Sequence, residues 1–177
     1  MPIREQISDI CRVCTNVSFF SAAVKLQKRG EHVYDILQHT PNHAFSASSN
    51  LNAQTRPFLS RYNNPHGGVS QAAWYANVQA PNQWIQVNFG IAKFFNEVVM
   101  APSHVKDPPE YVKTGTLHCG LDGFVVLPFG TVHMLQPKKY FFMFGLHYCR
   151  TVRLVVFDWK TNIAMRWEIL QASGKRH

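Results

Sequence analysis

The residues with the clearest capacity for chemistry are four cysteines, of which Cys11 and Cys14 form a Cys-x-x-Cys motif. A structural zinc site needs a second ligand pair, and Cys119 and Cys149 are not in a knuckle spacing, although a histidine beside each would allow a composite site. A redox role for the motif requires a following βαβ pattern, which is missing. We therefore expect reduced, inert thiols and no metal site.

The rest of the sequence contains no catalytic constellation. It lacks a nucleophile elbow, a His-Glu-x-x-His motif and a phosphate-binding loop. Only six acidic residues follow residue 43, and turns or a neighbouring arginine account for most of them. The sequence therefore predicts a binding protein and not an enzyme.

Positive charge is concentrated in the later part of the chain. The formal charge is +8, yet residues 1–43 hold five basic and four acidic side chains, whereas residues 44–177 hold thirteen and six. A basic domain favours anionic partners such as acidic lipid headgroups or sulfated and sialylated glycans. The basic residues are scattered and no nucleic-acid motif is present, so we expect no nucleic-acid partner.

The elements that must position any binding residues are predicted to be short β-strands. From Ala44 onward, runs of β-branched and aromatic residues alternate with turn clusters, among them the hairpin signal Asp122-Gly123. Such a pattern indicates an all-β antiparallel sandwich. The predicted strands are Trp84–Phe89, Glu97–Met100, Tyr111–Cys119, Phe124–Leu127, Tyr140–Phe144, Thr151–Phe157 and Ile163–Leu170.

Residues 1–43 differ from this pattern and are predicted to be a partly helical extension. Apolar residues between Ser21 and Gln38 recur at partly helical spacing, interrupted at Gly30, which predicts one or two short helices ending before Pro41. These helices would pack on the sandwich, with self-association through residues 1–43 as the alternative. Residues 172–177 form a basic tail.

Four local patterns follow one another along residues 44–171. They are ASSN at 47–50; AW at 73–74 with QWIQVNFG at 83–90; YVK at 111–113 leading to DG at 122–123; and RTVRL at 150–154 with Trp159 and IAMRWEIL at 163–170. Together they resemble the discoidin domain, also called the coagulation factor 5/8 type C domain, of the galactose-binding-like folds. The resemblance implies a jelly-roll β-sandwich over residues 44–171.

The chain departs from the family pattern at several positions. Extracellular members usually join their two ends by a disulfide, but no cysteine lies near Ala44 or after Leu170, which suits a reducing compartment. Asn88 replaces the usual aspartate, and Phe124 is the nearest residue to a missing tryptophan. Ligand specificity therefore cannot be copied from the family.

Most of the shared residues have a structural interpretation. We expect Arg166 and Glu168 to form a partly buried polar pair near the sandwich edge. Trp74 and Trp159 are predicted to lie in the core and not on a ligand platform. The predicted inward-facing residues are Trp84, Ile85, Val87, Phe89, Val152, Leu154, Ile163, Met165 and Ile169.

The resemblance implies that loops at the mouth of the barrel hold the ligand. These loops match Ser49–Arg56, Phe58–Ser70 and Ala101–Glu110, and they combine apolar, cationic and amide side chains. The predicted ligand-binding residues are Asn50, Leu51, Asn52, Arg56, Phe58, Arg61, Tyr62, Asn64, His66, His104 and Lys106.

Three binding functions remain open for these loops. Arginine, histidine and asparagine donors beside an aromatic ring suit lectin-like recognition of a carbohydrate or glycoconjugate, which we rank first. Apolar tips in a basic surround would suit an acidic phospholipid surface, at about 1 kcal/mol per basic residue. The third function is an intracellular protein-interaction or scaffold module.

The sequence shows neither a secretory signal nor a transmembrane segment. We therefore expect a cytoplasmic protein, or one that is exported by an unconventional route or after removal of a signal. No cofactor is predicted. Calcium occurs in some relatives, but Asp107 and Glu110 are the only loop carboxylates and are too few for a strong calcium site.

Overall fold

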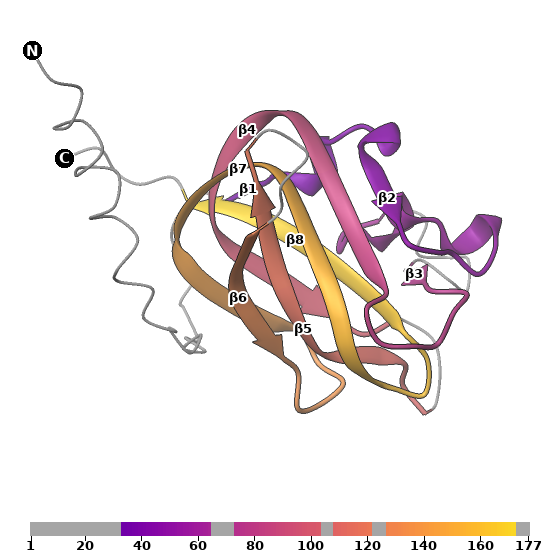
Figure 1. Cartoon of the computed structure of the whole chain (residues 1–177). Coiled ribbons are helices and arrows are strands. Elements are labelled where there is room, and N and C mark those ends of the chain that lie inside the picture. The colour runs from indigo at the N-terminus through magenta and orange to yellow at the C-terminus, as the bar shows by residue number, and fades with distance from the viewer. Residues whose placement is uncertain (1–32, 65–72, 104–107, 122–126, 173–177) are drawn as a thin grey trace, which may run out of the picture.

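The computed structural model describes residues 33–64, 73–103, 108–121 and 127–172, which form an all-β fold (Figure 1). Short 3₁₀ helices lie between the first strands: η1 (Leu37–His39), η2 (Asn42–Ala44), η3 (Ala53–Thr55) and η4 (Pro57–Ser60). The strands are β1 (Val33–Asp35), β2 (Phe45–Ala47), β3 (Trp74–Tyr75), β4 (Trp84–Ala101), β5 (Tyr111–Gly120), β6 (Leu127–His133), β7 (Tyr140–Lys160) and β8 (Ala164–Ala172).

Strands β4 and β7 are long because each crosses from one layer of the sandwich to the other. Residues 84–88 of β4 pair with residues 151–155 of β7, whereas residues 97–100 pair with residues 140–143. Between these halves the register shifts, and Gly90 adopts a φ of 76°, which favours glycine. Each of these bent strands therefore joins two of the strands that were predicted separately.

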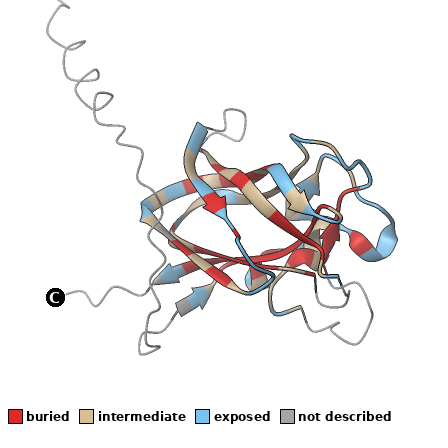
Figure 2. Cartoon of the chain, turned by 90° about the horizontal axis from the view of Figure 1, so that it is seen from below, coloured by how far each residue is buried: buried red, intermediate tan, exposed pale blue. Residues whose placement is uncertain are grey.

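The two halves of β4 and β7 build two antiparallel layers. One layer contains β2, the first half of β4, the second half of β7, β5 and β6. The other contains β1, β8, the second half of β4 and the first half of β7. Buried residues lie between the layers, and exposed residues lie outside them and in the loops (Figure 2). The predicted antiparallel sandwich is confirmed.

Alternation along the strands places most of the predicted core correctly. Trp84 is an exception: it is only partly buried, and the guanidinium of Arg153 lies 4.4 Å from its ring centroid. Phe89 is also partly buried, and Trp159 packs against the core from a partly buried position. Trp74 is fully buried, as are Ile85, Val87, Val152, Leu154, Ile163, Met165 and Ile169.

The strand predicted at Phe124–Leu127 lies further along the chain. β6 begins at Leu127, where the predicted strand ends, and it includes Pro128. β6 is the last strand in the sheet order, and an edge strand tolerates proline because no second neighbour needs its missing N–H. Phe124 itself lies outside the described residues.

Part of the predicted extension belongs to the sandwich. Residues 33–35 pair with residues 170–172 of β8, and the Ile36 N–H donates to the Ile169 carbonyl at 2.9 Å. Leu37 is fully buried. The predicted helix is therefore wrong after residue 33, because the free edge of β8 and the core together favour a strand and a 3₁₀ turn. Residues 1–32 lie outside the described part of the chain.

A disulfide joins Cys119 of β5 to Cys149 of β7, with their Cα atoms 5.5 Å apart. The expectation of reduced thiols is wrong for this pair. The cysteines are separated by 30 residues in sequence, and only the pairing of β5 with β7 brings them together. Because disulfides persist mainly in oxidising compartments, this bond weakens the argument for a reducing one. Cys11 and Cys14 lie outside the described residues.

Candidate functional site

Several connections meet at one end of the sandwich, which we call the mouth: the described parts of residues 48–56, 76–83 and 102–110, and the turn at 160–163. The Leu51 N–H donates to the Tyr75 carbonyl at 3.0 Å, and the Ala76 N–H donates to the Ile163 carbonyl at 3.1 Å. Two of the predicted ligand loops, Ser49–Arg56 and Ala101–Glu110, therefore share this end.

Buried polar groups hold the floor of the mouth. Glu110 is almost fully buried, and its carboxylate accepts a hydrogen bond from Asn162 Nδ2 at 2.5 Å. The Ser103 N–H donates to the Glu110 carbonyl at 3.1 Å, which closes the base of the loop between β4 and β5. Burial raises the pKa of Tyr75 to about 12, with a smaller rise from Glu110 and an opposing hydrogen bond to Ser103. Tyr75 is therefore neutral and serves to position the loops.

The first mouth loop is fixed by its own serine and asparagine side chains. The hydroxyls of Ser48 and Ser49 donate to Gln83 Oε1 at 2.7 and 2.8 Å, which ties the loop to the start of β4. Asn52 Oδ1 accepts the Gln54 N–H at 2.9 Å as the cap of η3. The backbone of this loop is therefore set by the chain's own contacts.

The rim of the mouth carries the groups that remain available to a ligand. Asn50 is exposed, although its Nδ2 donates to the Asn52 carbonyl at 3.3 Å, and Leu51 and Val78 are 49% and 48% exposed. Arg56 is exposed, and within the described ranges no hydrogen bond, ion pair or ring contact involves its guanidinium. The rim thus combines a cation, an amide and apolar side chains.

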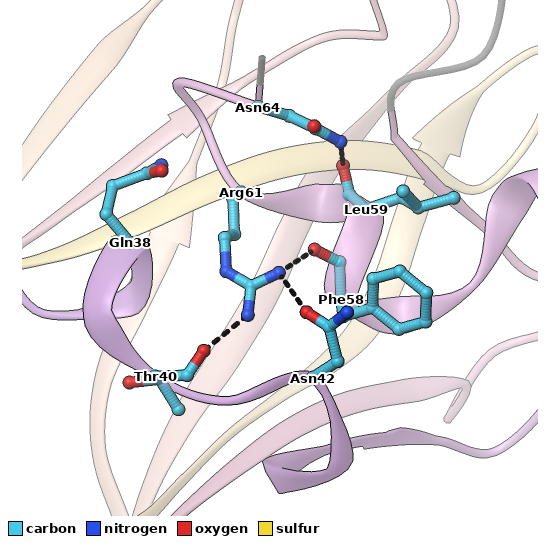
Figure 3. A pocket seen from close by; sticks show the side chains of 7 residues that line it. All are labelled: Gln38, Thr40, Asn42, Phe58, Leu59, Arg61 and Asn64. Carbon is cyan, nitrogen blue, oxygen red and sulfur yellow. Dashed lines mark hydrogen bonds between the residues drawn. The ribbon is translucent and has the colours of Figure 1, made fainter. Parts of the chain in front are cut away.

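The third predicted loop is different, because its described part lies along the edge of β8. The Tyr62 N–H donates to the Trp167 carbonyl at 2.9 Å, between the places where β3 and β1 pair with the same strand. A hollow of about 300 Å³ opens beside this segment (Figure 3). Its lining residues are Gln38, Thr40, Asn42, Phe58, Leu59, Arg61 and Asn64.

The guanidinium of Arg61 is enclosed by acceptors from three separate segments. Nε and Nη1 donate to the carbonyls of Leu37 and Phe58, both at 2.7 Å, and Nη1 also donates to Asn42 Oδ1 at 2.9 Å. Nη2 donates to the Thr40 carbonyl. Four of its five N–H groups are therefore used. Arg61 was predicted to bind ligand, but this geometry makes it a structural residue that joins η1, η2 and η4.

Glu168 binds the same turn, η1, through Leu37 and Gln38. Its Oε1 accepts the Leu37 N–H at 2.6 Å and the Ile169 N–H at 3.1 Å, while Oε2 accepts from Gln38 at 3.2 Å. Burial raises the pKa of Glu168 to about 7, against the lowering effect of these hydrogen bonds. Glu168 thus accepts the N–H of Leu37, and Arg61 donates to the carbonyl of the same residue.

Arg166 does not form the predicted pair with Glu168, although both side chains are buried. Its guanidinium donates from Nε to the Pro102 carbonyl at 3.0 Å and from Nη1 to the Tyr62 carbonyl at 3.3 Å. Arg166 and Glu168 therefore each form hydrogen bonds with nearby backbone groups and not with each other. The prediction was wrong because sequence proximity on β8 does not reveal which carbonyls lie nearby.

The remaining predicted site residues have mixed placements. The Tyr62 ring has Lys139 Nζ at 4.2 Å and the Arg166 guanidinium at 5.1 Å, and Asn64 Nδ2 donates to the Leu59 carbonyl at 3.1 Å. Phe58 packs against the core. His66, His104 and Lys106 lie outside the described residues.

Sequence reasoning missed two groups of residues around these sites. Residues 76–83 contribute Val78 to the mouth, and their turn-rich composition, Asn-Val-Gln-Ala-Pro-Asn, was the available signal. Gln38, Thr40 and Asn42 line the hollow, but they had been assigned to the extension. No pattern in the sequence marks them.

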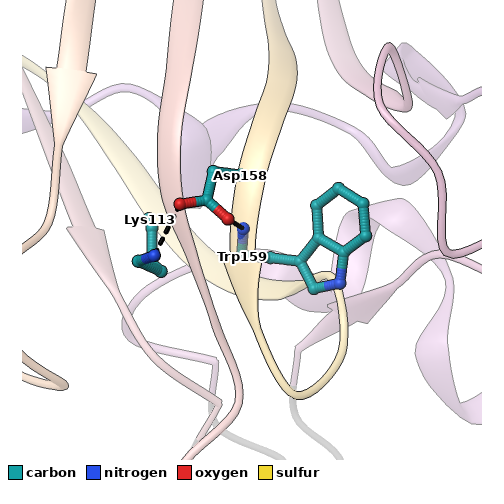
Figure 4. A network of polar contacts seen from close by, with 3 residues as sticks. All are labelled: Lys113, Asp158 and Trp159. Atoms are coloured by element: carbon teal, nitrogen blue, oxygen red, sulfur yellow. Dashed lines mark hydrogen bonds and ion pairs between the residues drawn. The ribbon is translucent and has the colours of Figure 1, made fainter.

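An exposed ion pair joins β5 to β7 (Figure 4). Lys113 Nζ lies 2.5 Å from Asp158 Oδ2, and Asp158 Oδ1 accepts the Trp159 N–H at 2.8 Å. The hydrogen bond between the two side chains raises the pKa of Lys113 and lowers that of Asp158. Both groups are open to solvent, which weakens their attraction.

Among the residues that the structure describes, no group of three His, Cys, Asp or Glu side chains could hold a metal ion. No helix among them is long and apolar enough to cross a membrane.

The F5/8 type C domain family matches residues 44–169, which is most of the chain. The chain belongs to this family. No curated protein matches this sequence. The recombinant discoidin II of Dictyostelium discoideum superposes with a TM-score of 0.68 at 17% identity, over 80% of this chain and 59% of that one. In a second discoidin II structure the match spans 53% of the protein, so this F5/8 type C chain covers little more than half of those relatives.

Smaller modules match over nearly their whole length. The chitosan-binding module 1 of a Paenibacillus sp. IK-5 chitosanase/glucanase has a TM-score of 0.60 at 17% identity, over 77% of this chain and 98% of the module. The family 32 carbohydrate-binding module of C. perfringens NanJ has a TM-score of 0.59 at 12% identity, over 74% and 96%. At these identities the likeness establishes the fold.

Proposed function

We propose that this F5/8 type C domain is a non-enzymatic module that binds a carbohydrate or glycoconjugate through its mouth. The observation that carries the proposal is the exposed Arg56, whose guanidinium has no partner among the described residues and lies in the same loop as Asn50 and Leu51. A sugar is recognised by directional donors and acceptors for its hydroxyls and by apolar surface for its C–H face. These three side chains supply each kind of group.

The fold neighbours support this class of ligand. The module from NanJ was solved with galactose, a module of AlyQ with 4,5-unsaturated mannuronic acid, and the chitosan-binding module 2 with chitotriose. The three sugars differ in charge and size. They therefore support carbohydrate binding as a class and leave the identity of the sugar to experiment.

The rigidity of the first mouth loop also favours binding. The serine bonds to Gln83, the backbone bond from Leu51 to Tyr75 and the capping box of Asn52 with Thr55 fix its shape before a ligand arrives. A preorganised loop loses less conformational entropy when it binds, so few contacts suffice for useful affinity.

A glycan array with the full chain tests the proposal, followed by titration of the best glycan into Arg56→Ala and Leu51→Ala. We expect binding to at least one glycan and a loss of about tenfold in affinity for each variant. Lys93→Ala, at the bend of β4 far from the mouth, is the matched control and should bind like the wild type. Absence of any bound glycan, or an equal loss in the control, would overturn the proposal.

A second candidate function is supported by the two half-exposed apolar side chains of the rim. Leu51 and Val78, together with the cationic Arg56 in the same loop as Leu51, would also suit an acidic phospholipid surface. Sedimentation with phosphatidylcholine vesicles, with and without phosphatidylserine and at two salt concentrations, tests it. Salt-sensitive binding that Leu51→Asp and Val78→Asp abolish would favour the membrane. Binding to neither glycans nor vesicles would favour the protein-interaction function.

A further inference from the structure

An apolar patch lies at the bend of β4 and β7, at the end of the sandwich opposite the mouth. We call it the distal patch and define it by Ile91, Phe94, Leu146 and Tyr148. These side chains are 67%, 48%, 71% and 49% exposed. Several exposed apolar side chains gathered at one end of a folded domain often mark an interaction surface.

Two irregularities in the pairing of β4 with β7 create the patch. The register shifts between Asn88 and Lys93, where Ile91 projects, and again between Phe95 and Glu97, opposite the stretch that contains Leu146. Bulges redirect side chains in this way. Between them, the Phe94 and Tyr148 rings pack with their centroids 4.3 Å apart. The patch is therefore built into the strands and does not depend on a loop.

The pairing of β1 shows where the preceding chain leaves the sandwich. Val33 lies beside Ala172 of β8, and Leu170 of β8 lies beside Glu97 of β4. Continuing this register places Ala172 level with Phe95, next to the patch. Two strand spacings separate Val33 from that point, or about 10 Å. Because β1 and β4 both run antiparallel to β8, the Val33 end of β1 lies at the same end of the sandwich as Phe94 and Ile91.

The segment that precedes Val33 has the composition and length to cover this surface. Residues 17–26 read Val-Ser-Phe-Phe-Ser-Ala-Ala-Val-Lys-Leu and contain no acidic residue. They are separated from Val33 by residues 27–32, whose extended length of about 20 Å exceeds the distance to be spanned.

We propose that residues 17–26 dock on the distal patch of the same chain, with Phe19 and Phe20 against Phe94 and Tyr148. The patch provides apolar surface and the segment provides apolar side chains, so contact removes both from water. A tethered segment has an effective concentration in the millimolar range, far above that of a second copy at ordinary protein concentrations. The tether therefore favours the chain's own segment over another molecule.

Hydrogen–deuterium exchange of the full chain tests this docking. We expect the amides of residues 17–26 to be protected in the wild type and to exchange about tenfold faster in Ile91→Asp and in Leu146→Asp. Leu135→Asp is the matched control, because Leu135 is 75% exposed but lies on the connection between β6 and β7. Its segment should exchange at the wild-type rate. Unchanged protection of β8 in all variants shows that each is folded.

The reciprocal change provides a second measurement. Phe19→Ser with Phe20→Ser should uncover the patch and raise the fluorescence of an added hydrophobic dye about twofold or more, on the reasoning that newly exposed apolar surface binds such dyes. Unprotected residues 17–26 in the wild type, or equal exchange in patch and control variants, would overturn the proposal. Protection that disappears on dilution together with a dimer in light scattering would show that a second copy covers the patch, which would also overturn it.

Discussion

Arg56 and Arg61 lie in the same stretch of chain and have opposite surroundings. Arg61 gives four of its N–H groups to acceptors of η1, η2 and η4, and its guanidinium also lies 4.4 Å from the Phe45 ring centroid. Arg56 is exposed at the mouth, and in the described part of the chain nothing bonds to its guanidinium.

The difference shows that residue type does not decide whether an arginine binds ligand. Arg61 lies where the carbonyls of Leu37, Thr40 and Phe58 and the side-chain oxygen of Asn42 converge, so the fold uses its hydrogen-bonding capacity. Arg56 follows η3 at a position that faces solvent, so its capacity remains for a ligand. A substitution should accordingly destabilise the domain at one position and weaken binding at the other.

The largest effect is expected for Arg61→Ala. Removing the guanidinium leaves several carbonyl oxygens without their donor, and we expect the free energy of unfolding to fall by about 4 kcal/mol. Chemical denaturation followed by tryptophan fluorescence measures it. Arg56→Ala is the control. If both variants unfold at the same denaturant concentration, the contrast between the two arginines does not hold.

Glu168, which binds the same turn as Arg61, should make the free energy of unfolding depend on pH, and Glu168→Gln should remove that dependence. The folded-state pKa of about 7 lies above the ordinary value of 4.5, so between these values the unfolded chain ionises while the folded chain keeps its proton. The stability from this group is therefore complete below pH 4.5 and falls by about 3 kcal/mol as the pH rises to 7.

Denaturation at intervals from pH 4 to 8 checks this prediction. The wild type should lose stability across that window more steeply than Glu168→Gln, and the two curves should run parallel above pH 8. Equal slopes throughout would show that Glu168 does not carry the proton.

Arg56→Ala should have a smaller effect, and only on binding. We expect its free energy of unfolding to stay within about 0.5 kcal/mol of the wild type, because an exposed side chain without partners contributes little to folding. Its affinity for the bound glycan should fall about tenfold, which corresponds to about 1.4 kcal/mol. Calorimetric titration and denaturation of the same preparation separate the two quantities. A large loss of stability would show that Arg56 has a structural role like that of Arg61, which would contradict the prediction.

Lys113→Met should have the smallest effect of all. The ion pair with Asp158 is exposed to solvent, and such pairs contribute little because water screens them and the side chains lose freedom. We expect no measurable change in the denaturation midpoint at 150 mM salt. A clear shift would mean that the pair also orders Trp159, whose N–H the same aspartate accepts.

The sequence predicted the strands well where side-chain alternation alone determines them. Ile85, Val87, Leu154 and Ile169 follow a period of two and are fully buried. The bends of β4 and β7 were missed because both halves of each strand have normal strand composition. Only the pairing with a partner reveals that they are continuous.

The mouth was predicted better than the hollow for a related physical reason. Asn50, Leu51 and Arg56 lie in a turn-rich stretch that any sandwich would place on its surface. The role of Arg61 depends on the backbone carbonyls of Leu37 and Thr40. Every residue has a backbone carbonyl, so no sequence pattern marks these two. The disulfide was missed for the same reason, because its two cysteines are brought together by the pairing of their strands and not by their spacing in the sequence.

The pairing of Val33 with Ala172 gives this domain a geometry suited to insertion into larger proteins. The chain enters and leaves the sandwich side by side, at the end away from the mouth. A neighbouring domain fused through β1 or β8 would thus lie at the end away from the mouth and leave the rim accessible. Several copies joined in tandem, or displayed from one stem, could then present their rims outward together and gain avidity without any new contact.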